Sequence, residues 1–219
     1  MESHLNPYEA RVLGVLIEKA YTTPDQYPLS LNATTNACNQ KSCRNPVVDY
    51  SEAEVLVTLK GLRMKHIAGG SIPAGSRIER WHHSAKEHWG LSDASLAVLA
   101  ELLLRGPQSA AALRSNASRM ITLASPEELQ KAIGPLEDKR MVHLLPPGGG
   151  SRVAQYECTL GATAEGPVAA PARPTLSMPS HVAPAPAAPE PDALAALTER
   201  VARLEQQLAD LAGRLGETL

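Results

Sequence analysis

The sequence is poor in aromatic residues and cysteine. Its 219 residues include no Phe, two Trp, five Tyr and three Cys. Any hydrophobic core must therefore be built from Leu, Val, Ile and Ala, which suits small helical domains. Three scattered cysteines are too few for a disulfide scaffold, and their odd number favours a reducing compartment.

Long apolar runs and a basic excess are also missing. The run from Val12 to Ile17 is bounded by Arg11 and Glu18, so no membrane span is expected. Glu2 stands where a signal peptide would be basic, which predicts a cytoplasmic protein. The formal net charge of −2 excludes a strongly basic nucleic-acid coat protein.

Motifs for catalysis or metal binding do not stand out. The serine elbow G-x-S-x-G is absent, and Gly148-Gly149-Gly150 fits a hairpin tip better than a phosphate-binding loop. Cys38 and Cys43 lie five residues apart, whereas zinc sites prefer closer cysteine pairs with a second pair of ligands. The sequence therefore predicts no enzyme, no cofactor and no metal.

Composition changes sharply near residue 161. Residues 161–191 contain eight of the 18 prolines and nine alanines, so they have almost nothing to bury. This range is expected to be a disordered Pro/Ala-rich linker between the globular part and the C-terminal segment.

Residues 192–216 carry apolar side chains at alternating intervals of three and four. This spacing predicts a coiled-coil helix that self-associates. Leu dominates both positions of the seam, which leaves dimer and trimer open, and packing on the chain's own globular part is the alternative. The expected oligomerisation residues are Leu194, Leu197, Val201, Leu204, Leu208, Leu211 and Leu215.

The first 160 residues contain an internal repeat. Leu13 and Leu99 are equivalent at a spacing of 86 residues, whereas the helix starts Ser51 and Ser125 are 74 apart. The difference means that the first half carries about 12 extra residues, placed at 39–50. This insertion is expected either to be functional or to brace the interface between the two halves.

Each half is expected to contain three helices followed by a β-hairpin. Capping-box patterns at Ser51–Glu54 and Ser125–Glu128 place the start of the third helix in each half. The predicted fold is mainly α (α+β), with two tandem winged helix-turn-helix domains at 1–90 and 91–160. Helices are expected at 7–20, 30–39, 93–104 and 109–116, and hairpin strands at 67–72, 77–83, 142–145 and 153–158.

A long motif carries a family resemblance. Residues 22–47 read TTPDQYPLSLNATTNACNQKSCRNPV, preceded by Glu18-Lys19 and followed by SEAEV at 51–55, with LRGPQ at 104–108 in the second half. Over residues 5–160 the chain resembles the YceH-like family of uncharacterised bacterial proteins. This resemblance implies two winged helices and a DNA-binding-like label without a known ligand. Cys43 stands where the family pattern has a polar residue.

Nucleic-acid binding is the leading functional hypothesis, through positive and amide side chains of the insertion and the first hairpin. Acidic residues in the first turn of both third helices argue against it, and residues 1–90 hold ten Lys and Arg against nine Asp and Glu. The alternative is a protein-interaction scaffold that uses the acidic faces of the third helices. The candidate nucleic-acid contacts are Asn39, Gln40, Lys41, Arg44, Arg77 and Arg80.

Overall fold

A computed structural model describes residues 4–148 and 152–161. These residues form a mixed α+β structure with small antiparallel sheets. The heptad segment 192–216, and all of the predicted linker except Gly161, lie outside the described residues.

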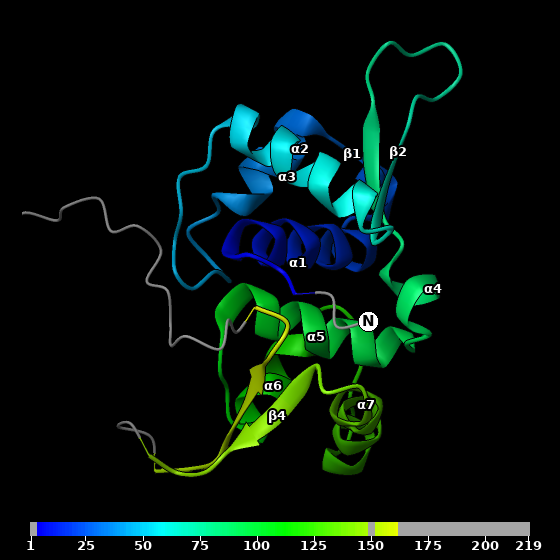
Figure 1. The fold of residues 1–219 in the computed structure, drawn as a ribbon. Coiled ribbons are helices and arrows are strands. Elements are labelled where there is room, and N and C mark those ends of the chain that lie inside the picture. Colours follow the sequence, from blue (N-terminus) through cyan, green and yellow to red (C-terminus); the bar gives the residue numbers. More distant parts are fainter. Residues whose placement is uncertain (1–3, 149–151, 162–219) are drawn as a thin grey trace, which may run out of the picture. The chain divides into compact units, whose positions relative to one another are not determined.

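The first half contains a helix, a short strand, two helices and a hairpin (Figure 1). Its three strands form an antiparallel sheet in the order β1-β3-β2. In this sheet Leu29 pairs with Trp81, and Gly70 pairs with the other side of Trp81. The elements are α1 (Pro7–Thr22), a 3-10 turn (Pro24–Gln26), β1 (Leu29–Ser30), α2 (Leu31–Cys38), α3 (Glu52–Met64), β2 (Ala68–Ser71), β3 (Arg80–His83) and α4 (Ala85–Trp89).

The second half repeats this order with a reduced sheet. Strands β4 and β5 form an antiparallel pair, and a single bridge between Gln108 and Tyr156 lies where the first half has β1. The elements are α5 (Asp93–Arg105), α6 (Ala110–Ala117), α7 (Pro126–Asp138), β4 (Val142–Leu145) and β5 (Gln155–Cys158).

Helix starts follow the capping residues of the sequence. Ser51 and Glu54 form the predicted reciprocal capping box of α3. At α7 the Ser125 hydroxyl accepts the Glu128 N–H as predicted, but the Glu128 carboxylate accepts the N–H of Ala124 at 2.7 Å. The predicted strand 142–145 matches β4, whereas the other three predicted hairpin strands are too long by two or three residues. Strand β1 and helix α4 were not predicted, because their two and five residues are too short to show a period.

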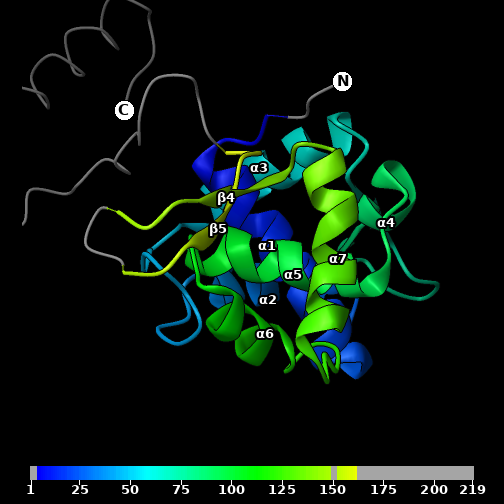
Figure 2. The ribbon, with the colours of Figure 1, turned by 90° about the horizontal axis from the view of Figure 1, so that it is seen from below.

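The core is shared by the two halves. Helices α1 and α5 lie side by side at its centre (Figures 1 and 2), and both are apolar along most of their length. Gly14 of α1 permits this approach, because a Cβ at that position would lie 2.9 Å from the Leu104 side chain. The last described residues return to the start of the chain, where the Leu5 N–H donates to the Leu160 carbonyl at 2.7 Å.

Candidate functional site

Helix α3 buries one side and exposes a regular stripe on the other. Val55, Leu59 and Leu62 are fully buried in the core of the first half. The opposite side is exposed at intervals of four, three and four residues. It carries Val57 and Met64, whose exposed fractions are 71% and 81%. These values are high for large apolar side chains. The exposed stripe consists of Ala53, Val57, Lys60 and Met64.

The β2–β3 hairpin also exposes large apolar side chains. Ile72 and Ile78, which flank its loop, are more than half exposed. The Arg63 guanidinium joins α3 to the hairpin, because it pairs with the Glu79 carboxylate at 3.0 Å and lies 5.2 Å from the Trp81 ring centre. We call this the α3–hairpin surface, defined by Ala53, Val57, Lys60, Arg63, Met64, Ile72, Arg77 and Ile78.

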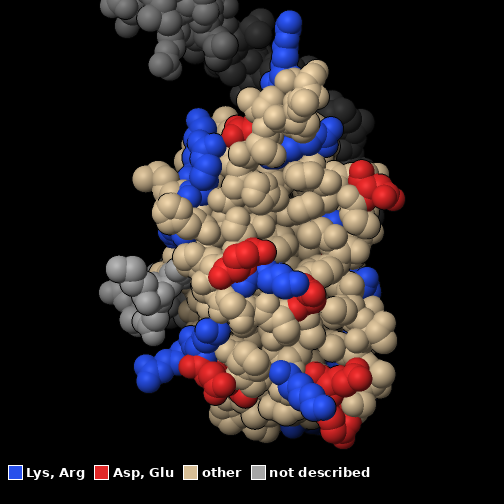
Figure 3. All heavy atoms as spheres, turned by 90° about the vertical axis from the view of Figure 1, so that its right-hand side faces the viewer, with Lys and Arg blue, Asp and Glu red and all other residues tan. Residues whose placement is uncertain are grey.

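Charge on α3 is divided between its two ends. Glu52 at the start accepts a hydrogen bond from the Asn32 amide at 2.8 Å, and Glu54 caps the helix. Lys60 and Arg63 lie in the second half of the helix. Figure 3 shows Lys and Arg side chains on one face of the molecule as separate groups, several of them beside Asp and Glu, and not as a continuous basic stripe.

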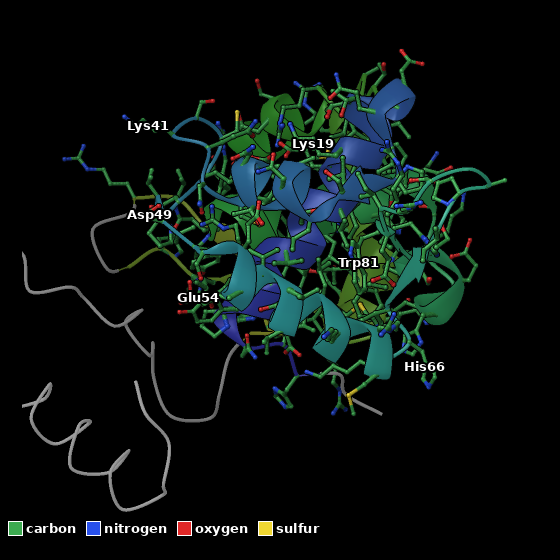
Figure 4. All side chains as sticks on the ribbon, turned by 90° about the horizontal axis from the view of Figure 1, so that it is seen from above. Lys19, Lys41, Asp49, Glu54, His66 and Trp81 are labelled. Carbon is green, nitrogen blue, oxygen red and sulfur yellow. The ribbon has the colours of Figure 1, made fainter. Side chains whose placement is uncertain are left out.

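The predicted nucleic-acid contacts do not form one surface. Asn39 exchanges two 2.8 Å hydrogen bonds with the Tyr50 backbone, and the Gln40 side-chain oxygen accepts from Arg44 at 3.0 Å. Arg80 is half-buried and donates to the Pro28 carbonyl at 3.1 Å. Lys41 and Arg77 are exposed, but the insertion and the hairpin extend from opposite sides of the first half (Figures 1 and 4).

The prediction that Arg44 contacts nucleic acid at the surface is wrong, because Arg44 lies in the interior. Its side chain is fully buried, and its guanidinium binds the carboxylate of Glu18 on α1 and the Ala37 carbonyl. An arginine in this position cannot reach a phosphate group. The physical reason is that Glu18 is itself buried and requires a positive partner.

Glu18 and Glu101 form a buried ion-pair network that links the two halves. Arg119 of the second half binds Glu18 of the first half and donates to Glu101 at 3.0 Å. Arg105 lies 3.3 Å from the other Glu101 oxygen. Burial raises the pKa of Glu18, but the hydrogen bonds and charges of Arg44 and Arg119 outweigh burial and leave that pKa lowered.

This buried network was not predicted from the sequence. The available signal was a single acid within an apolar run, since Glu101 interrupts LAVLAELLL and Glu18 follows VLGVLI. A carboxylate on the apolar side of a helix requires a buried partner.

The insertion serves as a brace. The Asn45 N–H donates to the Leu104 carbonyl at the end of α5 at 2.9 Å, and its side-chain amide donates to the Arg105 carbonyl at 3.3 Å. Buried Arg11 of α1 donates to the Pro46 carbonyl at 2.5 Å, and burial lowers its pKa. The insertion therefore connects α1 with α5, as the bracing alternative predicted.

Helix α7, the equivalent of α3 in the second half, exposes different side chains on its outer side. The 74-residue offset places Glu127, Lys131, Gly134 and Asp138 of α7 where α3 has its exposed stripe. The surface of α7 is charged and has no large apolar side chain at these positions. The α3–hairpin surface is thus a property of the first half.

The described residues contain neither a metal-binding cluster nor a membrane-spanning helix. Within 4–148 and 152–161, no group of three or more His, Cys, Asp or Glu side chains is placed to hold a metal ion. No helix of these residues is long and apolar enough to cross a membrane.

Residues 5–151 match a family described as "Protein of unknown function, DUF480". A UPF0502 protein of Geobacter sulfurreducens is 40% identical over 215 residues, which cover 96% of this chain and 91% of the relative. A UPF0502 protein of Hahella chejuensis is 45% identical over 163 residues, which cover 71% and 74%. One from Burkholderia pseudomallei is 44% identical over 154 residues, which cover 69% and 65%. None of these names states an activity, ligand or partner.

Proposed function

We propose that this chain, which belongs to the DUF480 family, is a non-enzymatic binding protein that docks an α-helical segment of a partner protein on its α3–hairpin surface. The observation that carries the proposal is the exposure of four large apolar side chains there, between 59% and 81%. Contiguous exposed apolar surface marks protein-interaction sites in soluble proteins. The four side chains are Val57, Met64, Ile72 and Ile78.

We further propose that residues 1–90 and 91–160 are winged helix-turn-helix domains. The order of helix, strand, two helices and hairpin, with sheet order β1-β3-β2, supports this assignment for the first half. The Gln108–Tyr156 bridge supports it for the second half. Self-association through the heptad segment and a cytoplasmic location also remain proposals.

The spacing of the α3 stripe suits a helical partner. Intervals of four, three and four residues form the seam along which a second helix packs. Lys60, Arg63 and Arg77 lie beside the apolar side chains, so a partner helix with carboxylates beside its own apolar seam is complementary to this surface.

DNA binding is the second candidate, and Arg77 and Lys60 favour it. Both side chains are exposed, and neither forms a hydrogen bond or ion pair with a side chain of the described residues. Arg63, by contrast, is already paired with Glu79. Two unpaired cations are few for a surface that must neutralise several phosphates, and the acidic start of α3 repels the backbone. Protein docking therefore accounts for more of the surface than DNA binding does.

Site-specific photo-cross-linking in bacterial cells tests the proposal. A photoreactive residue replaces Val57 in the full-length chain, and Lys131, at the equivalent place on α7, is the matched control position. We expect a discrete protein adduct at position 57, little adduct at 131, and loss of the adduct in a Met64→Asp variant.

Other outcomes contradict protein docking. Equal adducts at both positions would show non-specific contact, and nucleic-acid adducts at position 57 would favour DNA. Fluorescence anisotropy with mixed-sequence duplex DNA at about 50 and 200 mM salt checks the second candidate directly. Tight binding that Arg77→Ala and Lys60→Ala weaken would support DNA recognition instead.

A further inference from the structure

We propose that the partner at the α3–hairpin surface is a second copy of this chain, with the two α3 helices packed antiparallel about a two-fold axis. The inference rests on the proposed docking function and names its partner. Closed two-fold dimers use one self-complementary patch on both copies, so the surface must fit itself. The α3 stripe meets this condition in size and in charge.

The sizes of the stripe residues are complementary in the antiparallel arrangement. Reversal of one helix places Ala53 opposite Met64 of the second copy, and Val57 opposite its Lys60. A small residue thus faces a large one at each end, as interdigitated packing requires. The apolar stem of Lys60 covers Val57 of the second copy while its ammonium reaches solvent.

Charges beside the stripe are also complementary. Glu52 and Arg63 lie on the same side of the stripe but at opposite ends of α3, because each residue turns the helix by about 100°. Antiparallel packing therefore brings Glu52 of each copy to Arg63 of the other, which forms two identical ion pairs. Arg63 keeps 48% of its side chain exposed despite its contact with Glu79, so it remains accessible.

A parallel arrangement lacks this match. It would place Lys60 against Lys60 of the second copy, and like charges at close distance oppose association. It would also place Arg63 of the two copies on opposite sides of the seam, each on the side away from Glu52 of the other copy, so the ion pairs could not form. No ribbon of the described residues lies over α3 in the view of Figure 4, in which the helix runs from the labelled Glu54 toward His66. The stripe is therefore open to a second helix.

The interface is small, so pairing of α3 alone is expected to be weak. Thirteen residues form a helix about 20 Å long. The predicted association of the heptad segments would hold two copies together and raise the effective concentration of their α3 helices to the millimolar range. The full-length chain is therefore the form to test.

Disulfide cross-linking tests the antiparallel pairing. The full-length Ala53→Cys/Met64→Cys variant is oxidised under mild conditions, with each single variant and the unchanged chain as controls. The two positions lie about 16 Å apart on one helix, so no bond can form between them within a chain. We expect covalent dimer in the double variant, and at least fivefold less in each single variant and in the unchanged chain, which carries the native cysteines.

A charge exchange gives a test that does not depend on introduced cysteines. A Glu52→Arg chain has two repulsive pairs with itself, as does an Arg63→Glu chain, whereas a mixture of the two restores both attractive pairs. We expect association in the mixture to exceed that of either variant alone by about fivefold, as for two exposed ion pairs. Analytical ultracentrifugation with one fluorescently labelled component measures this difference.

The results separate the two proposals. A double-cysteine variant that cross-links no faster than its single-cysteine controls, or a mixture that associates no better than its components, overturns the antiparallel dimer. If position 57 then still forms a specific adduct with another protein, the docking function stands without the dimer. If position 57 forms no protein adduct at all, the docking function falls as well.

Discussion

The buried ion pairs around Glu18 give the sharpest test of how the two halves are held together. Glu18→Gln keeps the size of the side chain and removes its charge. Arg44, whose side chain is fully buried, then loses the one carboxylate partner that it has among the described residues. Loss of one partner of a buried ion pair costs about 3–5 kcal/mol. The retained bonds from Arg44 to the Ala37 carbonyl and the Gln40 side chain favour the lower end, about 3 kcal/mol.

This cost is measurable by urea denaturation and by thermal unfolding. For a chain of this size, about 3 kcal/mol corresponds to a fall of about 10 °C in Tm. The matched control is Glu79→Gln, which removes the exposed Arg63 partner and is expected to cost less than about 1 kcal/mol. If Glu18→Gln proved no more destabilising than Glu79→Gln, the buried network would not stabilise the contact between the halves.

Three further predictions concern the contact between α1 and α5, the thiol of Cys38 and the carboxyl group of Glu18. Gly14→Ala should cost about 1–3 kcal/mol because its Cβ would lie 2.9 Å from a side-chain atom of α5. Gly134→Ala should cost less than about 1 kcal/mol, because its Cβ meets no other part of the fold within 4 Å while Pro135 disfavours a helical conformation at the residue before it; urea titrations compare the two variants. Burial raises the pKa of Cys38 to about 12, so its alkylation at pH 8 should be about a thousandfold slower in the folded than in the unfolded chain. Mass spectrometry measures the alkylation of each cysteine, and half-buried Cys43 serves as the internal comparison. The lowered pKa of Glu18 contributes stability that is present above the unfolded-state pKa of about 4.3 and is lost as pH falls through the folded-state pKa. The stability difference between the unchanged chain and Glu18→Gln should therefore shrink below about pH 4. A difference that stays constant with pH would contradict this assignment.

Local sequence signals predicted the helices better than they predicted contacts. The Ser51–Glu54 capping box and the repeat offsets placed α3 and α7 correctly because caps and apolar periods are local properties. The burial of Arg44 was not predictable from its neighbours, since its partner Glu18 lies 26 residues away on another helix. A polar insertion with two cations resembles a solvent-exposed loop until its partners are known.

The exposed stripe of α3 was also not predicted from the sequence. The α3 sequence EAEVLVTLKGLRM is apolar around most of its circumference, and the repeat drew attention to Val55, Leu59 and Leu62, which do form the core. Val57 and Met64 follow the same spacing on the other side. A helix with two apolar sides is expected in a buried position or at an interface. The second apolar side of α3 was therefore the sequence signal for the proposed docking surface, and the acidic residues of the first turn pointed away from it.

The two halves share one order of elements, but only α3 of the first half carries the exposed apolar stripe to which the docking function is assigned in our proposal. Arg119 contacts Glu18 across the interface, and Asn45 of the insertion binds the end of α5, so the second half is fastened to the first at two independent points. At the positions where α3 exposes Val57, α7 exposes Lys131, whose charge keeps that helix in solvent. The second half exposes Leu144 and Val153 on its β4–β5 hairpin but no large apolar side chain on α7, so under the proposed function it supports the half that docks the partner. Disruption of Glu18 should therefore weaken docking on α3 only as far as it unfolds the chain, whereas Val57→Asp should abolish docking in a chain that stays folded.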